Sequence, residues 1–85
     1  MIKFDYTIKD ALGIHARPAG ELVKLVKTFE STVTINKDGK EADCRKILGV
    51  MGLGVKKDNQ VTITVDGNDE EKAAGLLKEF FEKNL

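Results

Sequence analysis

The sequence is poor in the residue types that build several common kinds of site. Among 85 residues it has one cysteine, Cys44, one histidine, His15, one proline, Pro18, and no tryptophan. A single cysteine excludes an internal disulfide and a cysteine metal cluster, and it suits a reducing compartment. We therefore expect no metal site and no bound cofactor, and we expect Cys44 to be a small buried apolar residue.

An excess of charge of either sign is also missing, as are long apolar runs. Fourteen Lys and Arg residues balance fourteen Asp and Glu residues, so the net charge is zero and no overall field attracts nucleic acid or an anionic membrane. The first ten residues alternate between apolar and polar types, which fits neither a signal peptide nor a membrane span. We expect a cytoplasmic protein that binds no nucleic acid, with residues 1–85 forming one domain.

Periodic apolar residues predict four strands and three helices. Alternation of apolar and polar residues indicates strands with one buried face, and spacings of three and four indicate helices with one apolar side. Asn68 and Glu71 are predicted to cap the last helix. Such elements bury one another most simply as an α+β, two-layer sandwich of order βαββαβα, with a Thr-rich sheet face in water. The predicted strands span residues 2–8, 32–36, 40–44 and 61–65, and the predicted helices residues 18–29, 45–53 and 69–81.

The stretch GIHARPA, residues 13–19, holds both the only histidine and the only proline. Pro18 fits the first turn of a helix and pushes Arg17 away from helical angles, so we predict a helix start at about Pro18. His15 and Arg17 would then lie in the loop before a helix N-terminus, where free N–H groups favour an anion. The sequence therefore predicts a phosphoryl acceptor at His15, with phosphate bound by Ala16, Arg17 and Pro18.

A second interpretation of the same residues stays open on chemistry alone. A lone histidine in a loop is more often a surface residue or a local hydrogen-bond partner than a catalytic group. The chain offers no second catalytic group and too little mass for an enclosed pocket, so we expect a carrier and not an independent enzyme.

Three stretches resemble the HPr family, the histidine-containing phosphocarriers of the bacterial phosphoenolpyruvate-dependent sugar phosphotransferase system. They are GIHARPAG at residues 13–20, DCRKILGVMGLGV at residues 43–55 and ITVDGNDEEKA at residues 63–73. The resemblance extends over essentially the whole chain. It implies an open-faced sandwich in which three helices cover one face of a four-stranded antiparallel sheet.

The resemblance also implies a role for the histidine. His15 would accept a phosphoryl group on Nδ1 from phosphorylated enzyme I and pass it to the IIA domains of sugar transporters, while Arg17 steadies the group. The carrier would act as a monomer. A regulatory binding module that uses the same docking face, or a paralogue in a nitrogen-type phosphorelay, would carry the same motif, so these two functions remain alternatives.

A carrier that meets two different partners needs an exposed apolar patch beside the histidine. In the family, the residues that correspond to Ile47, Leu48 and Met51 contact partners, whereas the alternative interpretation places the whole short helix in the core. Lys24 and Lys27 would add a basic rim that suits acidic partners, although a solvated helix face explains them equally well.

One position departs from the family pattern. In low-GC Gram-positive members, position 46 is a serine that a dedicated kinase phosphorylates to control carbon catabolite repression. Here the residue is Lys46. An amine cannot take that role, so the resemblance does not extend to this regulatory phosphorylation.

Overall fold

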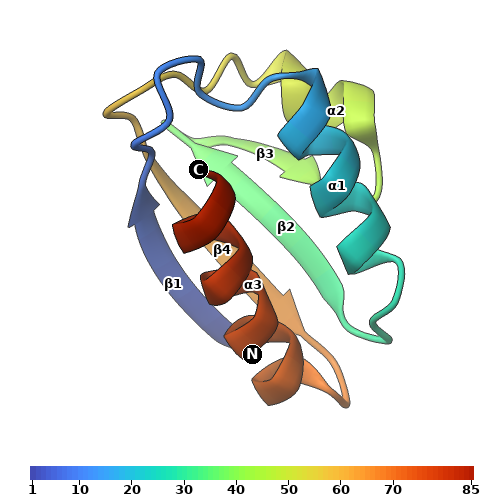
Figure 1. Ribbon diagram of the computed structural model, residues 1–85. Helices are drawn as coiled ribbons and strands as arrows, with labels where there is room; N and C mark the ends of the chain where they lie inside the picture. Colours follow the sequence, from blue (N-terminus) through green and yellow to red (C-terminus); the bar gives the residue numbers. More distant parts are fainter.

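The computed structural model describes residues 1–85 and confirms the predicted order of elements (Figure 1). All strand pairs are antiparallel, and the strands lie in the order β1-β4-β2-β3 across one sheet. The elements are β1 (Ile2–Thr7), α1 (Ala16–Val26), β2 (Thr32–Lys37), β3 (Lys40–Asp43), α2 (Ile47–Gly52), β4 (Gln60–Asp66) and α3 (Glu70–Asn84).

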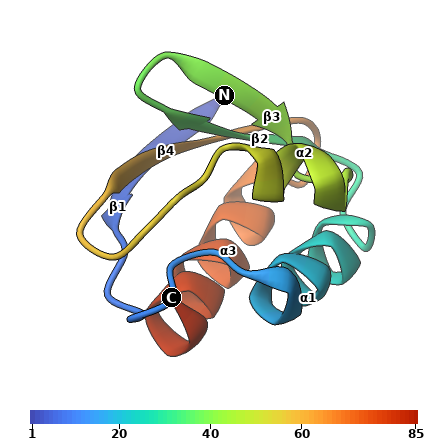
Figure 2. The same cartoon turned by 90° about the horizontal axis from the view of Figure 1, so that it is seen from above.

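The three helices lie on one side of the sheet, and the other side is open to solvent (Figure 2). Alternation along the central strands explains this arrangement, because every second side chain points toward the helices. Val33 and Ile35 of β2 stand opposite Val65 and Ile63 of β4, and all four are buried. The intervening positions of both strands carry mostly threonine. The predicted open-faced sandwich is therefore confirmed.

The core between the layers is one cluster of 19 buried apolar residues. Phe81 of α3 is fully buried and packs edge-on against Phe4 and Tyr6 of β1, with ring centroids 6.3 and 5.4 Å apart. Cys44 is buried as predicted, and desolvation raises the pKa of its thiol to about 12. A thiol that holds its proton so strongly is not a nucleophile near neutral pH.

The predicted cap of α3 is wrong. The N-cap residue is Asp69, not Asn68, and its carboxylate does not cap its own helix. Instead it accepts hydrogen bonds from the N–H groups of Glu30 and Ser31, at 3.0 and 2.9 Å, and from the Ser31 hydroxyl. A tertiary partner outcompetes the local capping geometry here. The buried side of α3 consists of Ala73, Ala74, Leu77 and Phe81, and Leu76 lies outside it and is exposed.

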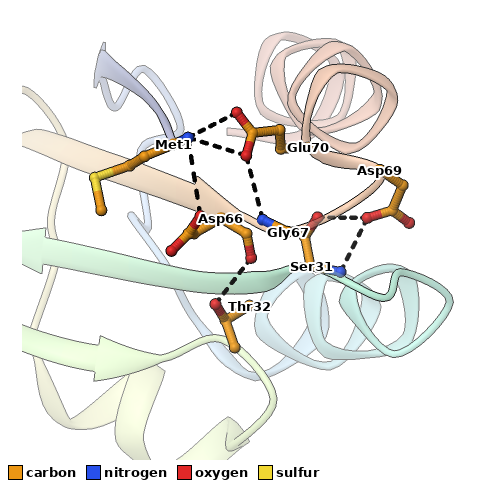
Figure 3. A network of polar contacts seen from close by, with 7 residues as sticks. All are labelled: Met1, Ser31, Thr32, Asp66, Gly67, Asp69 and Glu70. Atoms are coloured by element: carbon orange, nitrogen blue, oxygen red, sulfur yellow. Dashed lines mark hydrogen bonds and ion pairs between the residues drawn. The ribbon is translucent and has the colours of Figure 1, made fainter.

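Polar contacts join the start of α3 to three other segments (Figure 3). The N-terminal ammonium of Met1 donates to both carboxylate oxygens of Glu70, at 2.9 and 2.7 Å. It also forms an ion pair with Oδ1 of Asp66 at 3.8 Å. Glu70 also accepts a hydrogen bond from the N–H of Gly67. Together with the Ser31–Asp69 pair, these contacts fasten the start of β1 and the loop before β2 to the start of α3.

We expect Asp69→Asn to weaken the acid dependence of folding. Hydrogen bonds from Ser31 and Glu30 hold the pKa of Asp69 below its usual value of 3.8. A lowered native pKa means that the carboxylate stabilises the fold at neutral pH, and that this stabilisation is lost as pH falls through the native pKa. Urea unfolding at pH 7, 5 and 3 measures the effect.

The control for this prediction is Asp38→Asn, which removes an exposed carboxylate in a turn. Asp38 has a backbone φ of 51°, which asparagine also adopts readily. That variant should lose stability between pH 5 and pH 3 as the wild type does. Asp69→Asn should be less stable at pH 7 and lose less on acidification, with the remaining loss coming from Glu70, whose pKa is also lowered by the Met1 ammonium. Parallel curves for wild type and Asp69→Asn would contradict the prediction.

Candidate functional site

His15 is the N-cap residue of α1, with an extended backbone at φ −113° and ψ −176°. Its carbonyl accepts the first hydrogen bond of the helix, from the N–H of Ala19 at 3.0 Å. The imidazole is half-buried and makes no hydrogen bond. The N–H groups of Ala16 and Arg17 belong to the first turn, where no helical carbonyl can reach them. An uncommitted imidazole therefore lies beside uncommitted backbone donors.

The helix starts two residues earlier than predicted, so Arg17 lies in the first turn and not in the preceding loop. Proline disfavours helical angles in the residue before it, but Pro18 has no N–H to lose at this position, and the growing helix outweighs the local preference. Pro18 is buried and offers no donor to a phosphate. The Arg17 side chain is 87% exposed, and its Nε lies 3.7 Å from Oε1 of Glu21.

The side chains of His15 and Arg17 line an open hollow of about 300 Å³. No apolar aliphatic or aromatic side chain faces it, apart from the Pro18 ring. The end of α3 closes one side, because the C-terminal end of that helix lies next to the start of α1 (Figure 2). Sequence reasoning missed this wall, since nothing in the local pattern places the end of α3 beside the start of α1. The lining residues are Asp10, His15, Arg17, Pro18, Glu21, Lys83 and Asn84.

Backbone contacts fix the loop that carries His15. Gly13 has a φ of +68°, and a Cβ built there would lie 2.2 Å from the carbonyl oxygen of Val55. Next to it, the N–H of Ile14 donates to that same carbonyl at 3.0 Å. The N–H groups of Lys9 and Asp10 donate to the carbonyl of Leu85, at 2.6 and 2.9 Å. The loop is thus held both by the segment before β4 and by the end of α3.

The short helix α2 presents its apolar residues in two directions. Val50 is fully buried, whereas Ile47, Leu48 and Met51 are 38%, 81% and 37% exposed. The helix lies beside α1. A Cβ atom built at Gly20 of α1 would lie 3.7 Å from Cδ1 of Ile47. These three residues form what we call the α2 patch. The alternative interpretation, in which the whole short helix belongs to the core, is therefore wrong for this face.

Two cations hold α2 in place, and sequence reasoning missed both. Lys37 of β2 donates to the carbonyl of Gly54, just after the helix, at 3.2 Å. Arg45, just before the helix, donates from Nη2 to the carbonyl of Phe29 at 2.9 Å. Lys46 is the N-cap residue and makes no capping bond. Lys24 and Lys27 are exposed on α1 and at its end.

Comparison with known proteins decides the family. The model of the family described as "PTS HPr component phosphorylation site" matches residues 2–83. The chain belongs to the HPr family. It is 46% identical over 72 residues to the phosphocarrier protein HPr of Lysinibacillus sphaericus, covering 85% of this chain and 82% of that one. It is 40% identical over 85 residues to HPr of Mycoplasma genitalium, covering 99% and 97%. The HPr phosphocarriers serve the bacterial phosphotransferase system.

Solved structures agree in fold, and dimers occur among them. HPr of Thermoanaerobacter tengcongensis superposes with a TM-score of 0.92 at 36% identity, covering 98% of this chain and 93% of that one. Crh, the catabolite repression protein of Bacillus subtilis, superposes at 0.79 with 30% identity, covering 100% and 98%, and is described as a swapped dimer. The monomer expected for this protein therefore stays a prediction. No helix in it has the length and apolar character that a membrane span requires.

We expect Gly13→Ala to destabilise the protein by at least about 2 kcal/mol, because the methyl group would collide with the Val55 carbonyl and the positive φ would be strained. Gly75→Ala is the matched control. Gly75 lies inside α3 with open space at its Cβ position, so the change should raise stability by roughly 0.5–1 kcal/mol. Urea unfolding measures both. Equal stability of Gly13→Ala and wild type would show that the loop does not depend on this close approach.

Proposed function

We propose that the protein accepts a phosphoryl group on Nδ1 of His15 from phosphorylated enzyme I and passes it to the IIA domains of sugar transporters in the cytoplasm. The observation that supports this proposal is the half-buried His15 imidazole, which has no hydrogen-bond partner, belongs to the N-cap residue of α1 and lines an open polar hollow together with Arg17. Membership of the HPr family supports the same assignment.

The transfer itself is a displacement at phosphorus. The lone pair on Nδ1 forms the new nitrogen–phosphorus bond while the bond from phosphorus to the donor breaks, and that electron pair leaves with the donor. The second transfer runs the same displacement in reverse, with the IIA domain as the acceptor. No group is oxidised or reduced, and the protein ends each cycle unchanged.

The start of α1 stabilises the phosphorylated state. Phosphoryl oxygens beside His15 would accept hydrogen bonds from the N–H groups of Ala16 and Arg17, and the positive end of the helix dipole favours their negative charge. The Arg17 guanidinium adds a planar donor that fits two phosphoryl oxygens. Pro18 shapes the turn without donating. The openness of the hollow suits a group that must be reached by two partners in succession.

The α2 patch is the proposed docking surface for both partners. It combines apolar side chains that water touches in the free protein with a position beside α1. Burying such side chains against a partner supplies binding free energy, and the exposed Lys24 and Lys27 would guide acidic partner surfaces toward the site. The two cations that hold α2 would keep the patch at a fixed distance from His15.

We expect the protein to gain one phosphoryl group when it is incubated with phosphoenolpyruvate and enzyme I. Intact mass should rise by one phosphate, and the group should be lost in acid and kept in base, because the nitrogen–phosphorus bond is acid-labile. His15→Ala should gain none. An acid-labile phosphate on His15→Ala would overturn the assignment of the acceptor.

We expect Leu48→Asp to slow phosphoryl transfer from enzyme I about tenfold or more, because a carboxylate would be desolvated at the interface. Leu76→Asp on α3 is the control, since Leu76 is an exposed leucine away from the α2 patch. Both variants should keep cooperative urea unfolding. Equal transfer rates for wild type and Leu48→Asp would show that the α2 patch is not a docking surface.

A further inference from the structure

Two cations, Arg17 and Lys83, line the hollow beside His15. Each is paired with a carboxylate of its own helix. Nε of Arg17 lies 3.7 Å from Oε1 of Glu21, and Nζ of Lys83 lies 2.9 Å from Oε1 of Glu79. The two pairs differ in one respect. Glu21 itself lines the hollow together with His15, whereas Glu79 does not. A phosphoryl group on His15 would therefore meet the charge of Glu21 directly and compete with it for Arg17.

The charges that line the hollow cancel before phosphorylation. Asp10 and Glu21 contribute two negative charges, and Arg17 and Lys83 contribute two positive ones. A phosphoryl group adds up to two further negative charges near pH 7. A site built only to hold phosphate would surround it with an excess of positive charge, as Arg clusters do. This hollow instead holds a carboxylate one helical turn from the arginine that is meant to bind the phosphate.

We propose that Glu21 raises the phosphoryl-transfer potential of phosphorylated His15. It pairs with Arg17 in the free protein and repels the phosphoryl group in the phosphorylated protein. The inference rests on the proposed phosphorylation of His15. Any interaction that is less favourable in the phosphorylated than in the free protein shifts the transfer equilibrium away from the loaded carrier. Glu21 thus makes the loaded protein a better donor to the next partner. It is a positioning and tuning residue and does not touch the reacting atoms.

The exposure of the pair limits the size of the effect. The side chains of Arg17 and Glu21 are 87% and 47% exposed, so solvent screens their interaction. Exposed ion pairs of this kind change an equilibrium by about two- to fivefold, and salt reduces the change because the Debye length at 1 M is about 3 Å. A carrier that must both accept and give needs such a modest adjustment, because a very stable phosphohistidine would not pass its group on.

The test is the equilibrium constant for phosphoryl exchange between enzyme I and the purified protein, measured for wild type and Glu21→Gln by quantifying both phosphorylated proteins. We expect Glu21→Gln to shift the equilibrium about two- to fivefold toward the phosphorylated carrier at low salt and less at 1 M salt. This constant depends only on the free proteins at the start and the end. A residue that merely contacts enzyme I would change the rates of approach but leave the constant unaltered.

Two further variants make the result specific. Glu21→Asp keeps the charge and should stay closer to wild type than Glu21→Gln. Glu71→Gln makes the same charge change at the other end of α3, away from the hollow, and should match wild type. Equal constants for wild type and Glu21→Gln, or an equal shift in Glu71→Gln, would overturn the role of Glu21. If wild type gained no acid-labile phosphate on His15, the proposed function would fail first, and the mass measurement would show that separately.

Discussion

The structure depends on the burial of one face of the β2–β4 strand pair. Val33, Ile35, Ile63 and Val65 line the middle of the sheet on the side of the helices, and each is fully buried. Burying an aliphatic side chain of this size contributes about 1.5–3 kcal/mol, so these four positions make a large part of the driving force for folding. α1 and α3 cover this apolar strip, and their positions follow from it. The placement of His15 at the start of α1 is therefore a consequence of sheet packing.

Periodicity was sufficient for the architecture, because each element of this chain buries one face only. The strands alternate and the long helices have one apolar side, so the order of elements and the two layers could be predicted. The helix ends could not be predicted as well. The start of α1 lies at Ala16 because a proline in the first turn has no N–H to lose. The predicted cap of α3 is wrong because the helix begins one residue later, at an N-cap residue, Asp69, whose carboxylate binds Ser31 instead of its own helix. A prediction of helix caps from neighbouring residues fails where a segment distant in sequence binds the capping side chain.

The candidate site divides in the same way. The motif around His15 and Arg17 is contiguous in sequence, and it could be recognised without any knowledge of the fold. Asp10, Lys83 and Asn84 could not, because only the meeting of the loop after β1 with the end of α3 brings them to the hollow. The supports of α2 are of this second kind as well. Lys37 and Arg45 act through single hydrogen bonds to backbone carbonyls, and such contacts leave no periodic trace in a sequence.

The complete burial of Cys44 makes its thiol sensitive to local opening of the molecule. It lies in the segment that leads from β3 to α2, its side chain is inaccessible, and its N–H donates to the carbonyl of Val33 on β2. A thiol reagent can reach it only when the core around α2 separates from the sheet, and the high pKa leaves little thiolate until then. The rate at which Cys44 is alkylated under native conditions therefore reports how often the region that carries the α2 patch opens locally.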